Sequence, residues 1–274
     1  MQNAEEAEEQ HYLPYPPPVA ARAATPNDPP WSLPVAAGVW ILSILAILFA
    51  PVLFVIPYYV LSGKGVPAEP EKDPTVILLS LIATVPAHLF TLLVCYPVVT
   101  KGRKFPFFQT LGWRLGNFRW WYFLAIIIGF FALLAGISAI FPDTDNELLR
   151  ILRSSPMAAY FMAVLATLFA PFIEELVYRG VLYPAVERSA GKIVAVLIVT
   201  LLFAGIHFPQ YWGSPGSLLG ITLLSFVLTA TRAVSGNLLP CVILHFIFNG
   251  LQSVSIVYAT MNGGLEAPAN AFFR

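Results

Sequence analysis

Residues 157–188 read MAAYFMAVLATLFAPFIEELVYRGVLYPAVER, an apolar run that carries two adjacent glutamates, Glu174 and Glu175. About 20 apolar residues in a helix span the hydrocarbon core of a bilayer, and Met157–Leu176 is long enough to do so. A charged side chain at the centre of a bilayer costs at least about 2.5 kcal/mol, and such residues usually face the bundle interior and serve a function. The run therefore predicts a membrane-spanning helix that bears a polar site and continues as a polar helix to about Arg188.

The composition of the whole chain agrees with a membrane protein. The 274 residues are 58% hydrophobic and only 11% charged, with a mean hydropathy of +0.74. Soluble domains carry about 25% charged residues, so this chain lacks the polar surface that a water-soluble globule needs. The net charge is zero and no basic block is present, which argues against a nucleic-acid partner. We expect membrane lipid to surround the protein.

Seven apolar runs predict the architecture. The fold class expected is an all-α membrane protein, a polytopic bundle of about seven transmembrane helices within a range of six to eight. The site is expected between helices 4, 5 and 7. The predicted spans are Val35–Val60, Thr75–Val99, Trp120–Phe141, Met157–Leu176, the short Ile193–His207, the weak Leu218–Thr231, and Leu238–Tyr258.

The chain divides into four predicted segments. Residues 1–31 are acidic and proline-rich, a composition that cannot bury a core, and they are expected to form a disordered tail. Residues 32–100 form two N-terminal transmembrane helices, residues 101–262 form the core that carries the polar motifs, and residues 263–274 form a short C-terminal tail.

Basic residues predict the orientation in the membrane. With the N-terminus in the cytoplasm, nine of the 15 basic residues fall on the cytoplasmic side and five on the other, with Arg179 inside the membrane. Residues 100–119 carry most of this difference. Because cytoplasmic loops favour Lys and Arg, we expect a cytoplasmic N-terminus and, for the protein, a multi-pass location in the plasma membrane.

The string EELVYRG predicts different tasks for its two carboxylates. Residues i and i+4 share a helix face, so Glu175 and Arg179 are expected to pair. Glu174 points elsewhere and stays free to exchange a proton, as a general base or acid requires. The alternative is an ion-pair network that only locks helices together.

Histidines in or at the end of other spans complete the candidate site. A turn at Ala190–Gly191 would place Glu174 and His207 at the same depth, each about 24 Å from the turn. In HFIFN, His245 and Asn249 share one helix face. His88 has no polar companion in the sequence and is interpreted as an interhelical hydrogen-bonding residue.

Three motifs in this order resemble one family, the CPBP membrane proteins, which include the CAAX prenyl endopeptidase Rce1 and Abi-type proteins. The family pattern is EExxxR, FxxxH and HxxxN. The sequence has Glu174-Glu175-Leu-Val-Tyr-Arg179, Phe203-Ala-Gly-Ile-His207 and His245-Phe-Ile-Phe-Asn249. The string TLGWR from Thr110 also resembles a loop of this family. The similarity covers about residues 105–255 and leaves out the tail and the first two helices.

The resemblance implies an intramembrane peptidase, of the EC 3.4 type and commonly classed as a metalloendopeptidase. It implies that Glu174 and His207 activate a water, that His245 and Asn249 stabilise the oxyanion, and that Glu175 and Arg179 support them. A peptide or a lipidated protein is the implied substrate. Two histidines and a glutamate can also bind zinc, with Glu174, His207 and His245 as candidate ligands. We favour metal-free chemistry, and no other cofactor is expected.

Two other functions fit the sequence. A non-catalytic membrane scaffold or bacteriocin-immunity protein could keep this fold and bind a partner peptide. A proton-coupled transporter also places carboxylates and histidines in its spans, but transporters more often show two similar halves, and this sequence shows no internal repeat.

Overall fold

The computed structural model describes residues 24–63, 65–142 and 144–263, and these are almost entirely helical. Six helices are long and apolar enough to cross a membrane, and a seventh apolar helix has 16 residues. In the described part of the chain, the β-structure is limited to an isolated bridge between Thr25 and Asp28. The prediction of an all-α polytopic bundle is confirmed.

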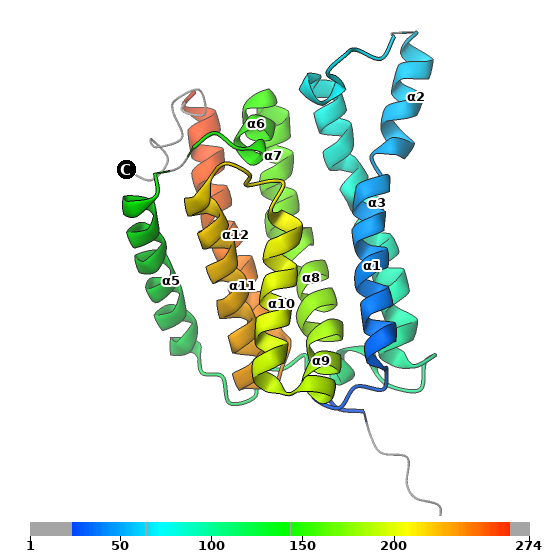
Figure 1. The fold of residues 1–274 in the computed structure, drawn as a ribbon, viewed down its shortest axis with the longest axis vertical. Helices are drawn as coiled ribbons and strands as arrows, with labels where there is room; N and C mark the ends of the chain where they lie inside the picture. The colour runs from blue at the N-terminus through cyan, green and yellow to red at the C-terminus, as the bar shows by residue number, and fades with distance from the viewer. Residues whose placement is uncertain (1–23, 64, 143, 264–274) are drawn as a thin grey trace, which may run out of the picture.

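The helices follow one another with short connections (Figure 1). Short helices in the connections are η1 (Pro70–Lys72), α4 (Phe107–Leu111) and α6 (Glu147–Ser154). The apolar helices are α1 (Leu33–Phe49), α2 (Val52–Ser62), α3 (Pro74–Thr100), α5 (Trp120–Ile140), α7 (Pro156–Val164), η2 (Leu165–Phe169), α8 (Ala170–Glu175), η3 (Leu176–Leu182), α9 (Tyr183–Ala190), α10 (Lys192–His207), α11 (Pro215–Ser235) and α12 (Leu239–Met261).

Two predicted spans differ in detail from the structure. The first predicted span is divided into α1 and α2, which meet at Ala50 and Pro51. Proline has no backbone N–H and its ring hinders the preceding turn, which explains the break. The weak sixth span is a complete helix of 21 residues, α11, because its serines and threonines lower the hydropathy without interrupting the helix.

The helix that carries Glu174 and Glu175 contains two π-helical segments. Residues 156–190 run without interruption from α7 to α9, and η2 and η3 lie on either side of α8. Such segments often occur at functional sites, and they free backbone carbonyls that need other hydrogen-bond partners. Pro171, in the first turn of α8, removes a further backbone donor. The polar motif is therefore placed on an irregular part of the helix.

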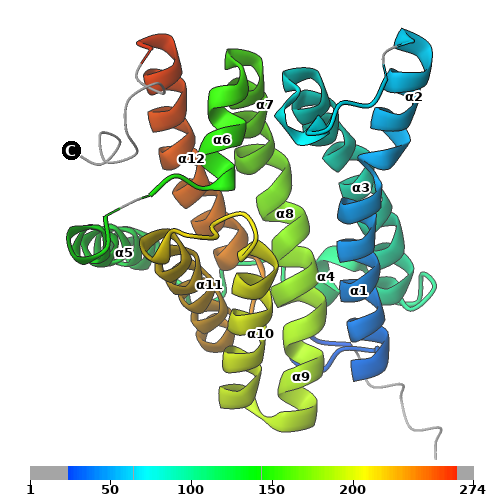
Figure 2. The ribbon, with the colours of Figure 1, turned by 45° about the horizontal axis from the view of Figure 1, so that its top comes forward.

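The predicted hairpin after this helix is present. Gly191 joins α9 to α10 with φ at +85°, a left-handed conformation that glycine adopts without strain. Figures 1 and 2 show α8–α9 and α10 side by side and antiparallel. The largest cluster of buried residues joins η3 and α9 to α1, α3 and α10, so this hairpin lies at the centre of the fold.

The remaining helices cover this centre. Helix α11 packs against α10 and α12, and α5 packs against α11 on the outside of the bundle (Figure 2). Within α5 only Phe130 is buried, and apolar side chains such as Leu124 and Ile128 are exposed, as expected for a helix that faces lipid. Both cysteines, Cys95 and Cys241, are buried free thiols.

The connections lie at two opposite ends of the bundle. The loop after α3, the α9–α10 turn and the α11–α12 turn lie at the lower end in Figure 1, together with the N-terminal segment. This agrees with the grouping of loops on which the orientation was based. The identity of the cytoplasmic end stays a prediction.

Residues 24–31, the last part of the predicted tail, contact the bundle. Trp31 is buried and donates from Nε1 to the carbonyl of Val181 at 2.9 Å. The guanidinium of Arg188 donates to the carbonyls of Pro29 and Trp31. These residues cannot form a core of their own, but they dock on helix ends that supply one. Residues 1–23 of the predicted tail, and 264–274 of the predicted C-terminal tail, lie outside the described residues.

We predict that Gly216→Ala destabilises the fold. An added Cβ would lie 2.6 Å from the backbone carbonyl oxygen of Phe141, so α5 and α11 would have to separate. We expect the free energy of unfolding, measured by denaturation in mixed micelles, to fall by about 1–3 kcal/mol. Gly136→Ala is the control, because a Cβ there meets nothing within 4 Å. Equal stability of the two variants would contradict the prediction.

Candidate active site

The centre of the site is an ion pair inside the bundle. Arg179 Nη1 lies 2.8 Å from Glu175 Oε1, and both side chains are 0% exposed. The pair is the predicted i,i+4 pair, and it forms across the start of η3. Losing one partner of a buried pair typically costs about 3–5 kcal/mol, because the other charge is left without compensation.

Helix α11 holds the guanidinium of Arg179. Nη2 donates to the carbonyl and the hydroxyl of Ser225, both at 2.9 Å, and Nε donates to the hydroxyl of Thr229 at 3.1 Å. The sequence-based site between helices 4, 5 and 7 is therefore incomplete, because the sixth span supplies part of it. The small polar residues on α11 are the signal that could have indicated this role.

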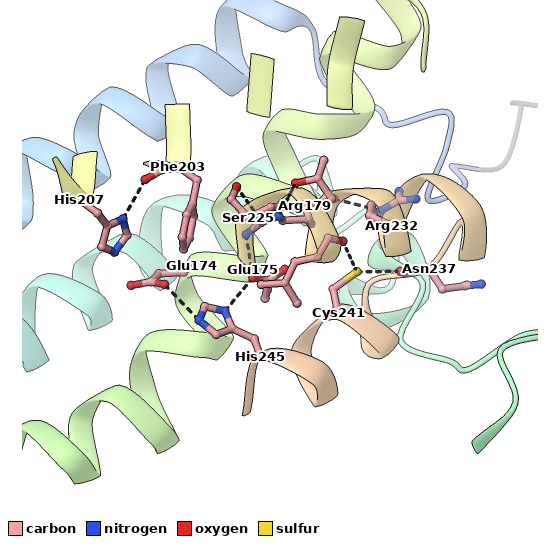
Figure 3. Close-up of polar contacts among 12 residues, drawn as sticks. Glu174, Glu175, Arg179, Phe203, His207, Ser225, Arg232, Asn237, Cys241 and His245 are labelled. Atoms are coloured by element: carbon pink, nitrogen blue, oxygen red, sulfur yellow. Dashed lines mark hydrogen bonds and ion pairs between the residues drawn. The ribbon is translucent and has the colours of Figure 1, made fainter. Parts of the chain in front are cut away.

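His245 lies between the two glutamates. Its Nδ1 is 2.8 Å from Glu175 Oε1 and its Nε2 is 3.8 Å from Glu174 Oε2. Because a carboxylate accepts, Nδ1–H is the donor to Glu175, and the ring is held with Nε2 directed at Glu174 (Figure 3). The distance of 3.8 Å is too long for a direct hydrogen bond and suits a bridging oxygen atom.

Glu174 differs from Glu175 in its surroundings, as predicted. Its side chain is 20% exposed, whereas that of Glu175 is completely buried. Its closest charged partner is the distant Nε2 of His245, so both carboxylate oxygens are available to a further molecule. The predicted pairing of Glu175 is present, and the role of Glu174 as a base or acid stays a prediction.

Phe203 positions His207. The ring of Phe203 is completely buried, with its centroid 4.6 Å from the carbon of the Arg179 guanidinium and 4.6 Å from the centroid of the His207 ring. His207 Nδ1 lies 2.8 Å from the carbonyl oxygen of Phe203, so Nδ1 carries the hydrogen and Nε2 is left to act as an acceptor or base.

The depth of His207 follows from the same contact. Helix α10 is antiparallel to α8 and η3, and Phe203 packs against Arg179. His207 lies one turn after Phe203, and the two glutamates lie about one turn before Arg179. His207 and the glutamates are therefore at the same depth. In the view of Figure 3 the Glu174 carboxylate lies between the rings of His207 and His245. Within the described residues, no hydrogen bond or ion pair joins Glu174 and His207 directly.

Asn249 lies one turn beyond His245 and faces α7–η2. Its Nδ2 donates to the carbonyl of Ala166 at 2.9 Å, one of the backbone groups in the π-helical segment. Ser253 makes a similar contact with the carbonyl of Ala163 at 3.1 Å. One N–H of Asn249 thus fixes α12 against the motif helix, and the second N–H is chemically available to a substrate.

A comparison with known protein families agrees with this geometry. Residues 156–251 match the family described as Type II CAAX prenyl endopeptidase Rce1-like. This segment is Rce1-like. The match confirms the predicted resemblance and supports a CAAX-protease-like intramembrane peptidase with a peptide or protein substrate. No curated protein and no solved structure matches the chain.

The TLGWR string precedes the Rce1-like segment and positions its last helix. The carbonyl of Gly112 accepts from the backbone N–H groups of Leu238 and Leu239, at the start of α12. Arg114 Nε donates to Asn237 Oδ1 at 3.1 Å. Gly112 has φ of +74°, and a Cβ there would lie 2.9 Å from the side chains of Asn237 and Pro26. The loop therefore sets where α12, and with it His245, begins.

Arg232 of the Rce1-like segment is a buried residue that the sequence analysis did not identify. It lies in the last turn of α11 and is only 1% exposed. Its Nε donates to the carbonyl of Arg179 at 3.1 Å, and its Nη atoms donate to Asn27 Oδ1 and to the carbonyl of Pro26. The N-terminal segment is thereby connected to the backbone of the ion pair.

Tyr211 lies on the connection between α10 and α11, close to the catalytic candidates. Its backbone N–H donates to the carbonyl of His207 at 3.2 Å. Burial, and in addition the negative charge of Glu174, raise the pKa of Tyr211 to about 12. The phenol therefore stays protonated near neutral pH.

The candidate zinc ligands do not form a compact site. Among the described residues, no three His, Cys, Asp or Glu side chains converge closely enough to hold a metal ion. Zinc binding by Glu174, His207 and His245 stays a prediction, and no reaction step below uses a metal.

We predict that Arg179→Lys destabilises the Rce1-like segment strongly. Lysine keeps the charge but cannot reproduce the planar set of donors to Glu175, Ser225 and Thr229. We expect the free energy of unfolding in mixed micelles to fall by at least about 2 kcal/mol.

The matched control is Arg150→Lys on α6. Arg150 also pairs with a glutamate on its own helix, Glu147, but its side chain is 34% exposed. Exposed pairs contribute at most about 1 kcal/mol. If both replacements had the same small effect, the buried pair would not be the centre of stability described above.

Proposed function

We propose that the protein is an intramembrane endopeptidase in which Glu174 activates a water molecule. The observation that carries this proposal is the position of His245. Its ring is fixed by a 2.8 Å contact with Glu175 and faces the partly exposed Glu174 across 3.8 Å. A structural ion pair needs Glu175 and Arg179 only, whereas the second carboxylate and the open distance are features of a reaction site.

The first step is attack by water. Glu174 accepts a proton from a water molecule as the water oxygen bonds to the carbonyl carbon of the scissile peptide. The electron pair of the C=O bond moves onto the carbonyl oxygen. His207, whose Nε2 is free as an acceptor, orients the same water. A base positioned in this way typically contributes 10²–10⁴-fold to the rate.

The negative charge on the carbonyl oxygen then needs hydrogen-bond donors. His245 supplies Nε2–H when it is protonated, because its Nδ1–H is already donated to Glu175. The second N–H of Asn249 is the other proposed donor. The C–N bond then breaks, and the proton held by Glu174 passes to the leaving nitrogen. Donors of this kind each contribute about 10²–10³-fold in other hydrolases.

The substrate follows from where the site is placed. A peptide or a lipidated protein that lies in the membrane can present a peptide bond to Glu174 without leaving the lipid. A non-catalytic scaffold or an immunity protein would need the Glu175–Arg179 pair for stability but would have no use for Glu174. The two kinds of function therefore differ in whether the side chain of Glu174 is needed.

We predict that Glu174→Gln abolishes cleavage and leaves the fold intact. The amide cannot accept the proton of water, so turnover should fall by about 10²–10⁴-fold. Because Glu174 is partly exposed and has no hydrogen-bonded partner at the distances above, the melting temperature should stay unchanged. Cleavage of a C-terminally lipidated membrane peptide in proteoliposomes, followed by mass spectrometry, measures the effect.

Glu69→Gln is the control for this experiment. Glu69 is an exposed residue that pairs with Lys72 away from the site. The Glu69→Gln protein should cleave the peptide at the rate of the unmodified protein. Undiminished turnover by Glu174→Gln would exclude Glu174 as the base and favour the scaffold function.

We also predict that cleavage does not require a bound metal. The imidazoles and Glu174 are spaced for water and substrate oxygens rather than for a compact ligand set. Protein dialysed against a membrane-compatible chelator and checked by elemental analysis should keep its turnover. Loss of turnover that stoichiometric zinc restores would overturn the metal-free chemistry.

A further inference from the structure

His88 is a buried polar residue that none of the three motifs includes. It lies on α3, outside the Rce1-like segment, and is 5% exposed. Its Nδ1 is buried and has no hydrogen-bond partner in the described part of the chain. Leaving a buried polar atom unpaired is unfavourable, so the atom requires an explanation. The interhelical hydrogen bond predicted for His88 from the sequence is not found among the described residues.

The register of α3 places His88 beside Glu174. Helix α3 runs parallel to the motif helix (Figure 1). Near its start, Ile77 and Leu81 belong to one buried cluster with Ala158. Near its end, Cys95 and Val99 belong to another with η3 and α9. His88 lies between these two sets of contacts along α3, and it is therefore at the level of α8.

Electrostatics supports this placement. The charge of Glu174 acts on His88, although the two residues are on different helices and 86 positions apart in the sequence. Helix α3 also contacts α8 directly. Glu174 is thus faced by imidazoles from three helices: His88 on α3, His207 on α10 and His245 on α12.

We propose that His88 is a positioning residue of the site, and that its Nδ1 and the Glu174 carboxylate hold the same reactive water. This proposal rests on the peptidase function proposed above. A buried water is stable when two to four polar groups surround it. The carboxylate of Glu174, Nε2 of His207 and Nδ1 of His88 provide such a set. His88 sets the direction of the water lone pair and leaves proton removal to Glu174.

Two substitutions separate this role from packing. In His88→Leu the polar atom is lost while apolar volume is kept, and in His88→Asn the amide can occupy the position of Nδ1. We expect kcat for the membrane peptide to fall at least tenfold in His88→Leu with KM within twofold of the unmodified protein, and His88→Asn to recover at least a third of kcat. The melting temperature of His88→Leu should not fall, because leucine keeps the apolar packing of α3 at this buried position.

The matched control is Leu89→Ala, at the neighbouring position of α3, whose side chain is 56% exposed. It should retain kcat and KM. A lower melting temperature in His88→Leu together with no recovery in His88→Asn would assign His88 to packing and overturn the proposal. Unchanged kcat in His88→Leu would overturn it as well.

A measurement without turnover keeps this test separate from that of the proposed function. Protein labelled with ¹⁵N-histidine gives a resonance for Nδ1 of His88, assigned by its loss in His88→Leu. Glu174→Gln should shift this resonance and Glu69→Gln should not. If the protein cleaves no peptide but the shift is present, the peptidase function fails and the pairing of His88 with Glu174 stands. Absence of the shift overturns the proposal whatever the activity.

Discussion

The buried contact between Arg179 and Glu175 is the constraint on which the rest of the structure depends. An ion pair that is completely removed from water depends on hydrogen bonds from the groups around it. Ser225 and Thr229 of α11 bind the guanidinium, and His245 of α12 makes the second contact of Glu175 Oε1, whereas Glu175 Oε2 has no hydrogen-bond partner among the described residues. One charged pair on the motif helix therefore dictates how two further helices pack, and it fixes the orientation of the His245 imidazole as a result.

The two adjacent glutamates behave differently because of the helix that carries them. Successive side chains on a helix point in different directions, so Glu175 faces α11 and α12 while Glu174 faces the partly open side. The π-helical segments on either side change the local helix geometry and leave carbonyls unpaired. Asn249 donates to the carbonyl of Ala166 in the first segment, and Ser253 donates to the carbonyl of Ala163 just before it. The π-helical geometry next to the glutamates therefore also connects α12 to the motif helix.

Much of this site could be predicted from the sequence, because charges in an apolar chain are few and i,i+4 spacing fixes a helix face. The pairing of Glu175 with Arg179 and the different direction of Glu174 followed from these two facts, and the hairpin followed from the turn expected at Ala190–Gly191. The role of α11 could not be predicted, since Ser225 and Thr229 are common residues without a periodic signal. The burial of Arg232 could not be predicted either, because a basic residue at the end of a span usually marks an exposed loop. Residues 24–31 have the composition of a tail and become ordered only against a surface that other helices form.

Charge balance explains why the site is stable in a membrane and can still react. Glu174, Glu175, Arg179 and His245 lie in one cluster inside the bundle, so the charged groups of the motif are kept away from lipid. In the proposed reaction Glu174 becomes neutral when it takes the proton of water, and the negative charge moves to the carbonyl oxygen of the substrate. The charge is displaced within one cluster and never created in the lipid. His245 faces it before and after the step, held in place by Glu175. The Glu175–Arg179 pair thus keeps the His245 ring in place while Glu174 takes part in the proposed reaction.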